Sequence, residues 1–208
     1  MKKYIYTAIA GLFVSCEALR LTYDQQDYED IAETGDLIFQ TEIGRSQAFA
    51  IQAATFSPYN HVGVVIKENN KFYVYEAHGP VKKISLTKYI NRKGTGKRFV
   101  VYRHDDITEK NHAKVKRYLK SQVGKPYDNR LSWSSSAQYC SELAYKSLEY
   151  ANLDLETPQK IKDLTLAVQI GKIIPNGYKL SNLKLEEKVV SPGYLSNDIN
   201  IYKVYQNW

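Results

Sequence analysis

Cys140 is the residue of this sequence best suited to nucleophilic chemistry. It lies near the start of a helix predicted over Ala137–Ala151, after a run of serines that suit helix capping. One face of that helix carries Cys140, Leu143, Ala144, Ser147, Leu148 and Ala151. We therefore expect the thiol to face the body of the protein, where the free amides of a helix start favour the thiolate and stabilise an oxyanion. A buried structural cysteine fits the same pattern.

His61 is the best-placed base for such a thiol. By alternation, His61, Gly63 and Val65 share one face of a predicted strand. A short polar turn follows and makes the next strand antiparallel, so that Glu76 near its end can lie beside His61. A carboxylate in that place fixes the imidazole tautomer and stabilises the imidazolium. The missing side chain of Gly63 permits the close approach of another element.

The other histidines have different predicted uses. His112 lies among lysines on a predicted surface helix, and His104 adjoins two aspartates with which it can pair. His78 follows Glu76 by two residues, and these two with a further histidine could ligate zinc. No HExxH helix and no CxxC pair is present, so a zinc site is the weaker alternative. We predict a site that uses no metal and no cofactor.

The N-terminus has the composition of a secretion signal over residues 1–15. Lys2 and Lys3 precede an apolar run over Tyr4–Val14 that is too short to span a bilayer. Phe13-Val14-Ser15-Cys16 resembles the lipobox of a bacterial lipoprotein signal, which implies cleavage before Cys16 and lipidation of its thiol. A plain secretion signal with an incidental cysteine is the alternative. We expect a protein of the cell envelope that is anchored to the membrane by lipid.

Lipidation of Cys16 would leave Cys140 as the only thiol of the mature chain, with no intramolecular disulfide. A lone thiol in an oxidising envelope risks oxidation unless it is shielded or useful. This raises Cys140 above an ordinary core cysteine.

Composition indicates a folded protein, and the predicted export makes nucleic acid an unexpected partner. The 208 residues are 43% hydrophobic and 25% charged, which is ordinary for one globular domain. Tyrosine is abundant, with 18 residues against 6 phenylalanines, and suits half-buried strands and the walls of a cleft. The net charge of +7 includes short basic clusters at 82–83, 92–93 and 97–98, which we interpret mainly as solvated surface. No nucleic-acid recognition motif is present.

Hydrophobic periodicity predicts a single α+β domain over residues 34–208, preceded by a tether at 16–33. Predicted strands are Leu37–Gln40, Val62–Lys67, Lys71–Ala77, Val81–Ser85, Arg98–Arg103 and Ile199–Tyr205. Besides Ala137–Ala151, predicted helices are Gln47–Phe56, Leu86–Asn91 and Thr108–Val123. The signals weaken after Thr157.

Five ordered segments resemble the YiiX/YaeF-like branch of the NlpC/P60 superfamily. They are Asp36-Leu-Ile-Phe-Gln40, Ser57-Pro-Tyr-Asn-His61-Val-Gly63, Tyr75-Glu76-Ala77, Gly124-Lys-Pro-Tyr127-Asp128 and Tyr139-Cys140-Ser141-Glu142-Leu143. The resemblance implies a circularly permuted papain-like fold, with an antiparallel sheet packed against helices. It also implies that the base precedes the nucleophile in the chain, as the order His61, Glu76, Cys140 does.

Carried over by position, the resemblance implies that Cys140 is the nucleophile, His61 the base and Glu76 the third polar residue. Tyr127 and Tyr139 are implied to line the site, and Gln40 is assigned with them to substrate binding. The implied reaction is hydrolysis of an amide bond through a thioester, in a peptide, an amino-acid amide or a lipid-linked amide. Two alternatives stay open: a non-catalytic module that binds peptide or lipid in its cleft, and a thioester acyltransferase.

Overall fold

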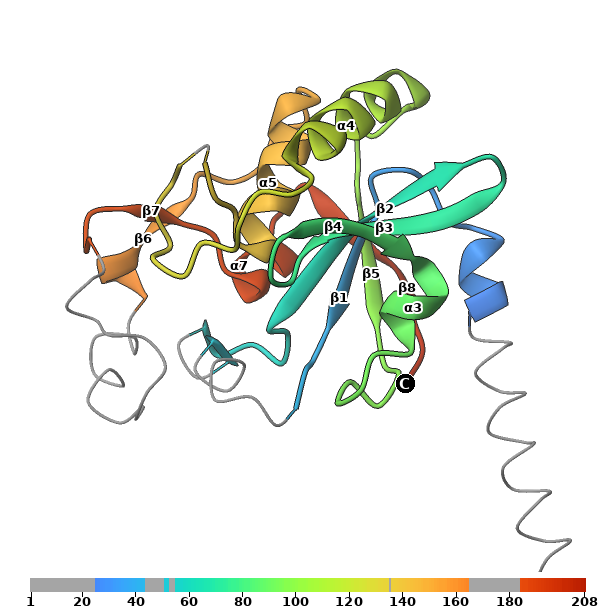
Figure 1. Cartoon of the computed structure of the whole chain (residues 1–208), viewed down its shortest axis with the longest axis horizontal. Helices are drawn as coiled ribbons and strands as arrows, with labels where there is room; N and C mark the ends of the chain where they lie inside the picture. Colours follow the sequence, from blue (N-terminus) through green and yellow to red (C-terminus); the bar gives the residue numbers. More distant parts are fainter. Residues whose placement is uncertain (1–24, 44–50, 53–54, 135, 165–183) are drawn as a thin grey trace, which may run out of the picture. The chain divides into compact units, whose positions relative to one another are not determined.

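The computed structural model describes residues 25–43, 51–52, 55–134, 136–164 and 184–208 (Figure 1). The chain divides into two units, residues 1–32 and 33–208, and each is described by itself. The described part of the first unit is a helical turn at 25–29. The predicted signal, Cys16 and most of the predicted helix Gln47–Phe56 lie outside the described residues, although 51–52 and 55 are helical. No described helix is long and apolar enough to cross a membrane.

The second unit is built on a six-stranded sheet in the order β4-β3-β2-β1-β5-β8, and every neighbouring pair is antiparallel (Figure 1). Its strands are β1 Leu37–Gln40, β2 His61–Glu68, β3 Lys71–Ala77, β4 Val81–Ser85, β5 Val100–His104 and β8 Ile201–Gln206. The predicted strands are thus confirmed to within about two residues. The sheet and its helices confirm the α+β class.

The β2–β3 hairpin forms because its turn residues accept a left-handed backbone. Asn69 and Asn70 have φ angles of 51° and 59°, the conformation that a two-residue turn of a twisted hairpin needs. The ladder pairs Glu68 with Lys71 next to the turn and ends at Val64 with Tyr75.

Beyond that last pair the two strands separate. Residues 61–63 of β2 pair with β1, and Glu76 and Ala77 of β3 pair with Lys82 and Val81 of β4. The helix that carries Cys140 contacts both strands, on the open side of the hairpin. The opening therefore brings a helix start to the strand ends that carry His61 and Glu76.

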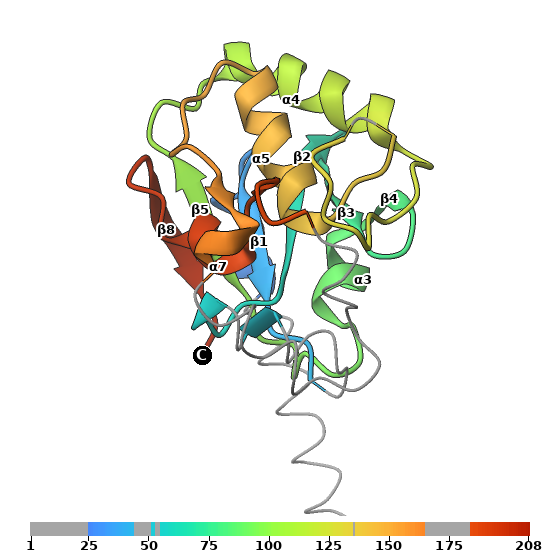
Figure 2. The same ribbon diagram turned by 90° about the vertical axis from the view of Figure 1, so that its left-hand side faces the viewer.

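Helices cover both faces of the sheet. On one face α4 (Glu109–Gln122) and α5 (Cys140–Tyr150) pack together over Leu37, Phe39, Val62 and Val64 (Figure 2). The short helix α3 (Leu86–Ile90) lies apart from them, against β3 and β4 (Figure 2). Its fully buried Tyr89 approaches Gly63, where an added Cβ would lie 3.2 Å from the ring. The expected close approach at Gly63 is confirmed.

The start of α5 differs from the prediction, because it begins at Cys140 rather than at Ala137. Gln138 is extended instead: it forms a bridge with Tyr127, and its N–H donates to the carbonyl of Pro126 at 3.0 Å. Tyr139, rather than a serine, precedes the helix as its N-cap. Ser132 donates its hydroxyl to Asp128 at 2.7 Å and belongs to a loop. Cys140 is thus the first residue of its helix.

The tail contains elements that periodicity did not predict. Strands β6 (Gln159–Lys160) and β7 (Lys188–Val189) form a separate two-stranded antiparallel sheet, and a 3-10 turn (Ile161–Asp163) follows β6. Helix α7 (Pro192–Ser196) begins at Ser191, whose hydroxyl accepts the N–H of Tyr194 at 3.0 Å.

Candidate active site

His61 and Glu76 form a buried pair at the open end of the hairpin. His61 Nε2 lies 2.7 Å from Glu76 Oε2, and neither side chain is more than 6% exposed. The ionised carboxylate accepts only, so Nε2 carries a proton toward it. The other ring nitrogen, Nδ1, is then the one available to a nucleophile. The expected placement of Glu76 beside His61 is present in the structure.

Cys140 meets the imidazole of His61 at the first turn of α5. Its thiol is buried, and the groups that act on its pKa besides burial are the imidazole of His61 and the backbone of Val62 and of Ser141. The N–H of Val62 belongs to the separated part of β2, and the N–H of Ser141 is one of the amides that a first helical turn leaves without a helical partner. The sulfur therefore lies where amides from a strand and from a helix converge.

These surroundings favour a charged thiolate–imidazolium pair. Burial raises the pKa of Cys140, but the hydrogen bond and charge of His61 and the two amides outweigh it, so the net pKa is lowered. Burial lowers the pKa of His61, yet its bonds to Cys140 and Glu76 raise that pKa to about 9. Burial likewise raises the pKa of Glu76, but His61 and Arg92 lower it to about 2. The net shift of each of the three groups therefore favours its ionised form.

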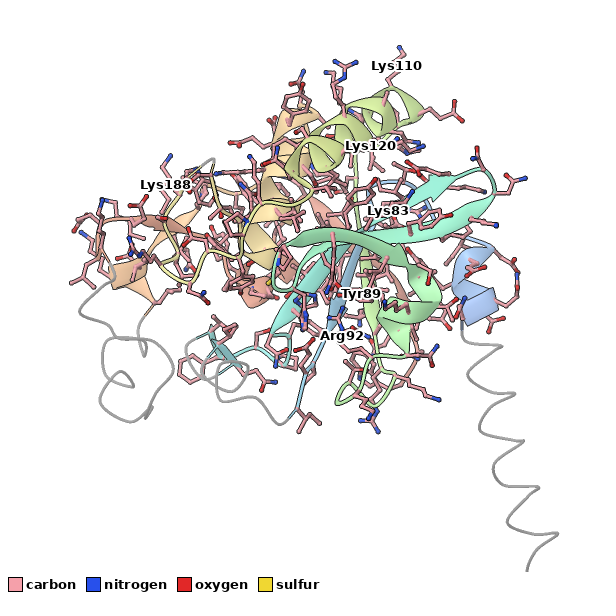
Figure 3. The ribbon with its side chains drawn as sticks, in the orientation of Figure 1. Lys83, Tyr89, Arg92, Lys110, Lys120 and Lys188 are labelled. Atoms are coloured by element: carbon pink, nitrogen blue, oxygen red, sulfur yellow. The ribbon has the colours of Figure 1, made fainter. Side chains whose placement is uncertain are left out.

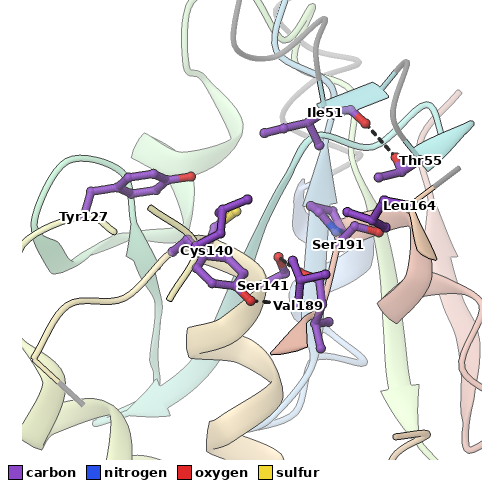
Figure 4. Close-up of a pocket in the computed structure, with 12 residues that line it drawn as sticks. Ile51, Thr55, Tyr127, Cys140, Ser141, Leu164, Val189 and Ser191 are labelled. Carbon is purple, nitrogen blue, oxygen red and sulfur yellow. Dashed lines mark hydrogen bonds between the residues drawn. The ribbon is translucent and has the colours of Figure 1, made fainter. Parts of the chain in front are cut away.

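A mainly apolar cavity of about 100 Å³ opens at Cys140 (Figure 4). Figure 4 shows Tyr127 on one side of the thiol and Ser191 and Leu164 on the other. The lining is Ile51, Thr55, Tyr127, Leu131, Tyr139, Cys140, Ser141, Leu164, Val189, Val190, Ser191 and Pro192. The structure thus brings Tyr127 and Tyr139 to the cavity with Cys140.

The tail supplies one wall of this cavity. The hydroxyl of Ser141 donates to the carbonyl of Val190 at 2.7 Å, and the N–H of Val190 donates to the hydroxyl of Tyr139 at 3.2 Å. The residues on either side of Cys140 are therefore tied to one residue of the tail. Sequence reasoning missed this wall, and only the Ser191-Pro192-Gly193 helix start marks it in the sequence.

Gln40 does not reach this cavity. It lies opposite His61 in the β1–β2 register and is fully buried. Its Nε2 donates a long hydrogen bond of 3.5 Å to the carbonyl of Ile90, while Oε1 has no hydrogen-bond partner in the part of the chain that is described. Its position supports a role behind His61 better than contact with substrate.

Two charged neighbours of the pair, Arg92 and Glu42, were not predicted, whereas His78 was expected close to Glu76. Arg92 was interpreted as surface charge, but its side chain is only 14% exposed and donates to Glu76 at 2.5 and 2.6 Å. It also donates to Glu42 at 2.9 Å, and Glu42 lies 3.1 Å from His78 Nε2. No local signal marks these contacts, because the partners are 16 to 50 residues apart.

The remaining histidines do not join the site. His104 Nε2 donates to the carbonyl of Asp154 at 2.7 Å, and Nδ1 accepts the N–H of Asp106 at 3.1 Å, so its partners are backbone groups rather than carboxylates. His112 is half-buried rather than fully solvated, and burial lowers its pKa. Among the described residues, no group of three or more His, Cys, Asp or Glu is placed to hold a metal ion.

Comparison with known proteins identifies the family. The model of the permuted papain-like amidases (YaeF/YiiX, C92 family) matches residues 31–205. The uncharacterized protein YiiX of Escherichia coli (strain K12) is 37% identical over 179 residues, which cover 85% of this chain and 87% of that protein. A crystal structure described as metalloprotein yiiX from Escherichia coli O157:H7 aligns with a TM-score of 0.76 and 37% identity, over 85% of this chain and 98% of that one. The chain therefore belongs to the YaeF/YiiX (C92) family of permuted papain-like amidases, a narrower grouping than the NlpC/P60 superfamily.

Proposed function

We propose that this protein hydrolyses amide bonds with Cys140 as nucleophile, His61 as general base and acid, and Glu76 as the group that orients His61. One observation carries the proposal: a buried thiol at a helix start lies beside a buried imidazole, and a buried carboxylate holds Nε2 of that imidazole. The family membership supports a cysteine hydrolase of amide bonds.

The first half of the reaction makes a thioester. The Cys140 thiolate attacks the scissile carbonyl carbon, and a carbon–sulfur bond forms as the carbonyl electrons move to oxygen. The oxyanion is held by the N–H of Cys140, which the first helical turn leaves without a helical acceptor. The tetrahedral intermediate collapses, the carbon–nitrogen bond breaks, and the His61 imidazolium gives its proton to the leaving nitrogen.

The second half regenerates the enzyme. Neutral His61 takes a proton from water while the water oxygen attacks the thioester carbonyl. The carbon–sulfur bond then breaks, the acid product leaves, and Cys140 and His61 return to the ion pair. Glu76 keeps the same ring nitrogen of His61 protonated throughout, so that the other faces the reacting atoms.

The apolar cavity supports a substrate with an apolar, uncharged group next to the scissile bond. Most of its lining side chains are apolar, and a buried charge there would lose its hydration without gaining a partner. Peptides, amino-acid amides and lipid-linked amides that carry such a group all fit this requirement.

The metal implied by the related metalloprotein structure does not fit the residues of this site. Glu76 already accepts from His61 and from Arg92, and Glu42 from Arg92, with His78 also against it. A guanidinium thus occupies the place between the two carboxylates where a cation would bind. The proposed mechanism routes no step through a metal.

For location, we propose a lipoprotein of the cell envelope whose membrane anchor is Cys16. The support is the basic start, the short apolar run and the lipobox-like Phe13-Val14-Ser15-Cys16. In cells fed a labelled fatty acid, the full-length protein should carry label and sediment with membranes, and Cys16→Ser should do neither. Equal membrane recovery of the two proteins would exclude the anchor.

The mechanism is tested with Cys140→Ala and His61→Ala in the purified protein. Incubation with peptidoglycan stem peptides and with N-acyl amino acids, followed by mass analysis, should give cleavage products only with the unmodified chain. The amount of free acid formed without an added amine or alcohol separates hydrolysis from acyl transfer, because a transferase needs such an acceptor to turn over. Iodoacetamide should label Cys140 fast in a way that depends on His61. Turnover by Cys140→Ala would refute the mechanism, and ordinary free-thiol reactivity would favour a binding module.

A further inference from the structure

One guanidinium joins two imidazole–carboxylate pairs behind the proposed nucleophile. Arg92 Nη2 donates to both oxygens of Glu76, at 2.5 and 2.6 Å, and Nη1 donates to Glu42 at 2.9 Å. Glu76 holds His61 at 2.7 Å, and Glu42 holds His78 at 3.1 Å. The His61 and His78 rings meet edge to face, with centroids 5.4 Å apart.

We propose that Arg92 is the positioning residue of this site: it aims the Glu76 carboxylate at His61, and Glu42 holds Arg92 in place. This rests on the proposed function, because it assigns a role to Arg92 only if the Cys140–His61 pair is reactive. It goes beyond that function by extending the three-residue site with four more residues, Arg92, Glu42, Tyr89 and His78.

The geometry requires a fork rather than a point charge. Nη2 of Arg92 donates to both oxygens of Glu76 while Nη1 donates to Glu42, so the two prongs of one guanidinium fix the two carboxylates relative to each other; Oε2 of Glu76 also accepts from His61. Lys82 offers a comparison, since its Nζ lies 3.7 Å from Oε1 and supplies charge without a close hydrogen bond. A planar guanidinium holds two acceptors at fixed angles, which an ammonium does not.

Arg92 is itself held on several sides. Its guanidinium lies 5.0 Å from the centroid of the Tyr89 ring, and both residues are labelled close together in Figure 3. Tyr89 in turn stacks on His61 at 5.8 Å, and its hydroxyl donates to the carbonyl of Ile38 at 2.9 Å. Ring, guanidinium and imidazole thus form a layered stack in which His61 has little freedom to turn.

Glu42 is anchored to Asn60, the residue that precedes His61 in the sequence. Its N–H donates to Asn60 Oδ1 at 2.8 Å, and Asn60 Nδ2 donates back to the Glu42 carbonyl at 2.9 Å. Burial raises the pKa of Glu42, but His78, His61 and Arg92 lower it to about 2, so it remains an anion for Arg92 at neutral pH. The pair of Glu42 and His78 therefore holds one end of the Arg92 guanidinium, whose other end contacts Glu76.

The test is the pH dependence of Cys140 alkylation by iodoacetamide. In the unmodified protein the rate should rise in two steps, at the pH where the thiolate–imidazolium pair forms and again where His61 loses its proton. The charged groups that face this pair are Glu76, Arg92, Lys82 and Glu42, and His78 is a further titratable group there. Together these groups determine the pH of both steps in the alkylation rate, and each variant changes one of them.

Arg92→Gln should narrow the pH range between the two steps, which is the range in which the thiolate–imidazolium pair exists. A Glu76 that no longer aims at His61 stabilises the imidazolium less, so the upper step should fall and the lower step should rise, each by about one pH unit, or about tenfold in the ion-pair population. Arg92→Lys keeps the charge but loses the fork, and it should show the same narrowing to a smaller extent. If Arg92→Gln does not fold, Arg92→Lys alone decides.

Two control variants distinguish the positioning of Glu76 by Arg92 from two other effects, a change of nearby charge and a loss of stability. Lys82→Gln removes one charge near Glu76 but leaves the clamp, so the upper step should rise slightly, which is the opposite sign. Arg103→Gln breaks a matched clamp on Asp36 and Glu33 at the other end of β1, and should lower the melting temperature without moving either step.

The outcomes distinguish this proposal from the function on which it rests. A single step at the pKa of an ordinary thiol in the unmodified protein, unchanged by His61→Ala, overturns the proposed function. If the unmodified protein shows two steps and both occur at the same pH in the two Arg92 variants, only the positioning role of Arg92 is overturned. An upper step that rises in Arg92→Gln, as in Lys82→Gln, also overturns it, because Arg92 would then act only through its charge.

Discussion

Replacement of Gly63 by alanine probes how tightly the sheet and α3 close around His61. A Cβ at this position would lie 2.3 Å from Val74 Cγ1, 3.2 Å from the Tyr75 carbonyl oxygen and 3.2 Å from Tyr89 Cε2. Favourable contacts between carbon atoms lie at about 3.5–4.0 Å. The Tyr75 contact is backbone, Val74 is fully buried and stiff at χ1, and Tyr89 is pinned by its hydroxyl. No neighbour can yield at low cost.

The expected loss follows from overpacking of a closed core. Inserting one carbon into such a site destabilises a protein by about 1–3 kcal/mol. For a domain of this size, a loss of about 2 kcal/mol lowers the melting temperature by roughly 4–8 °C. Val74→Ala removes the Cγ1 that the new Cβ would meet, and alone it should destabilise by about 2 kcal/mol through the cavity it leaves.

Urea unfolding of Gly63→Ala, Val74→Ala and the double variant forms a double-mutant cycle. The double variant should be more stable than the sum of the two single losses predicts, with a coupling of about 0.5–3 kcal/mol. Tight packing around Gly63 is refuted if the free energy of unfolding of Gly63→Ala lies within about 0.5 kcal/mol of that of the unmodified protein and the coupling is zero. The added Cβ would then meet no constraint from Val74.

Three further predictions address the site. Glu76→Gln should bring the pKa of His61 down from about 9 toward its ordinary value, followed by NMR of the imidazole, and reduce turnover by about 10²-fold to 10⁴-fold. N-butyl iodoacetamide should alkylate Cys140 at least about tenfold faster than iodoacetamide, since each buried CH₂ contributes about 0.8 kcal/mol, and Leu131→Asp should abolish that preference. Burial raises the pKa of Glu142 to about 7, so ionisation of its carboxyl destabilises the fold as the pH rises from about 4.3 to 7. In urea unfolding, Glu142→Gln should therefore raise the free energy of unfolding by up to about 3 kcal/mol at pH 8 and leave it unchanged at pH 4.

Much of the sheet was predictable because its signals are local. The polar turn around Asn69 separates two β-branched runs, and Thr108 caps α4 as expected. The start of α5 was not predictable, because Gln138 is drawn into a bridge with Tyr127, a partner in a distant loop. Strands β6 and β7 have two residues each, which is too short for an alternation of apolar and polar residues to be seen in the sequence.

The candidate site shows the same division. His61 and Glu76 could be paired from the sequence, because hairpin register decides which residues share a face. Arg92 was missed because it follows α3 in a basic pair that resembles exposed charge, and its burial depends on carboxylates from two other segments. The wall formed by the tail was missed because its position depends on hydrogen bonds to residues that flank Cys140.

The tie between Val190 and the start of α5 has a consequence for how this family can diversify. At Val190 the tie uses only main-chain atoms, its carbonyl toward Ser141 and its N–H toward Tyr139. We therefore expect that the side chains of the neighbouring wall can be exchanged, in evolution or by mutagenesis, while Cys140 stays anchored. For the proposed hydrolase, we expect substrate selectivity to be separable from the reactivity of Cys140, and the residues around position 190 are the place to begin altering the first without the second.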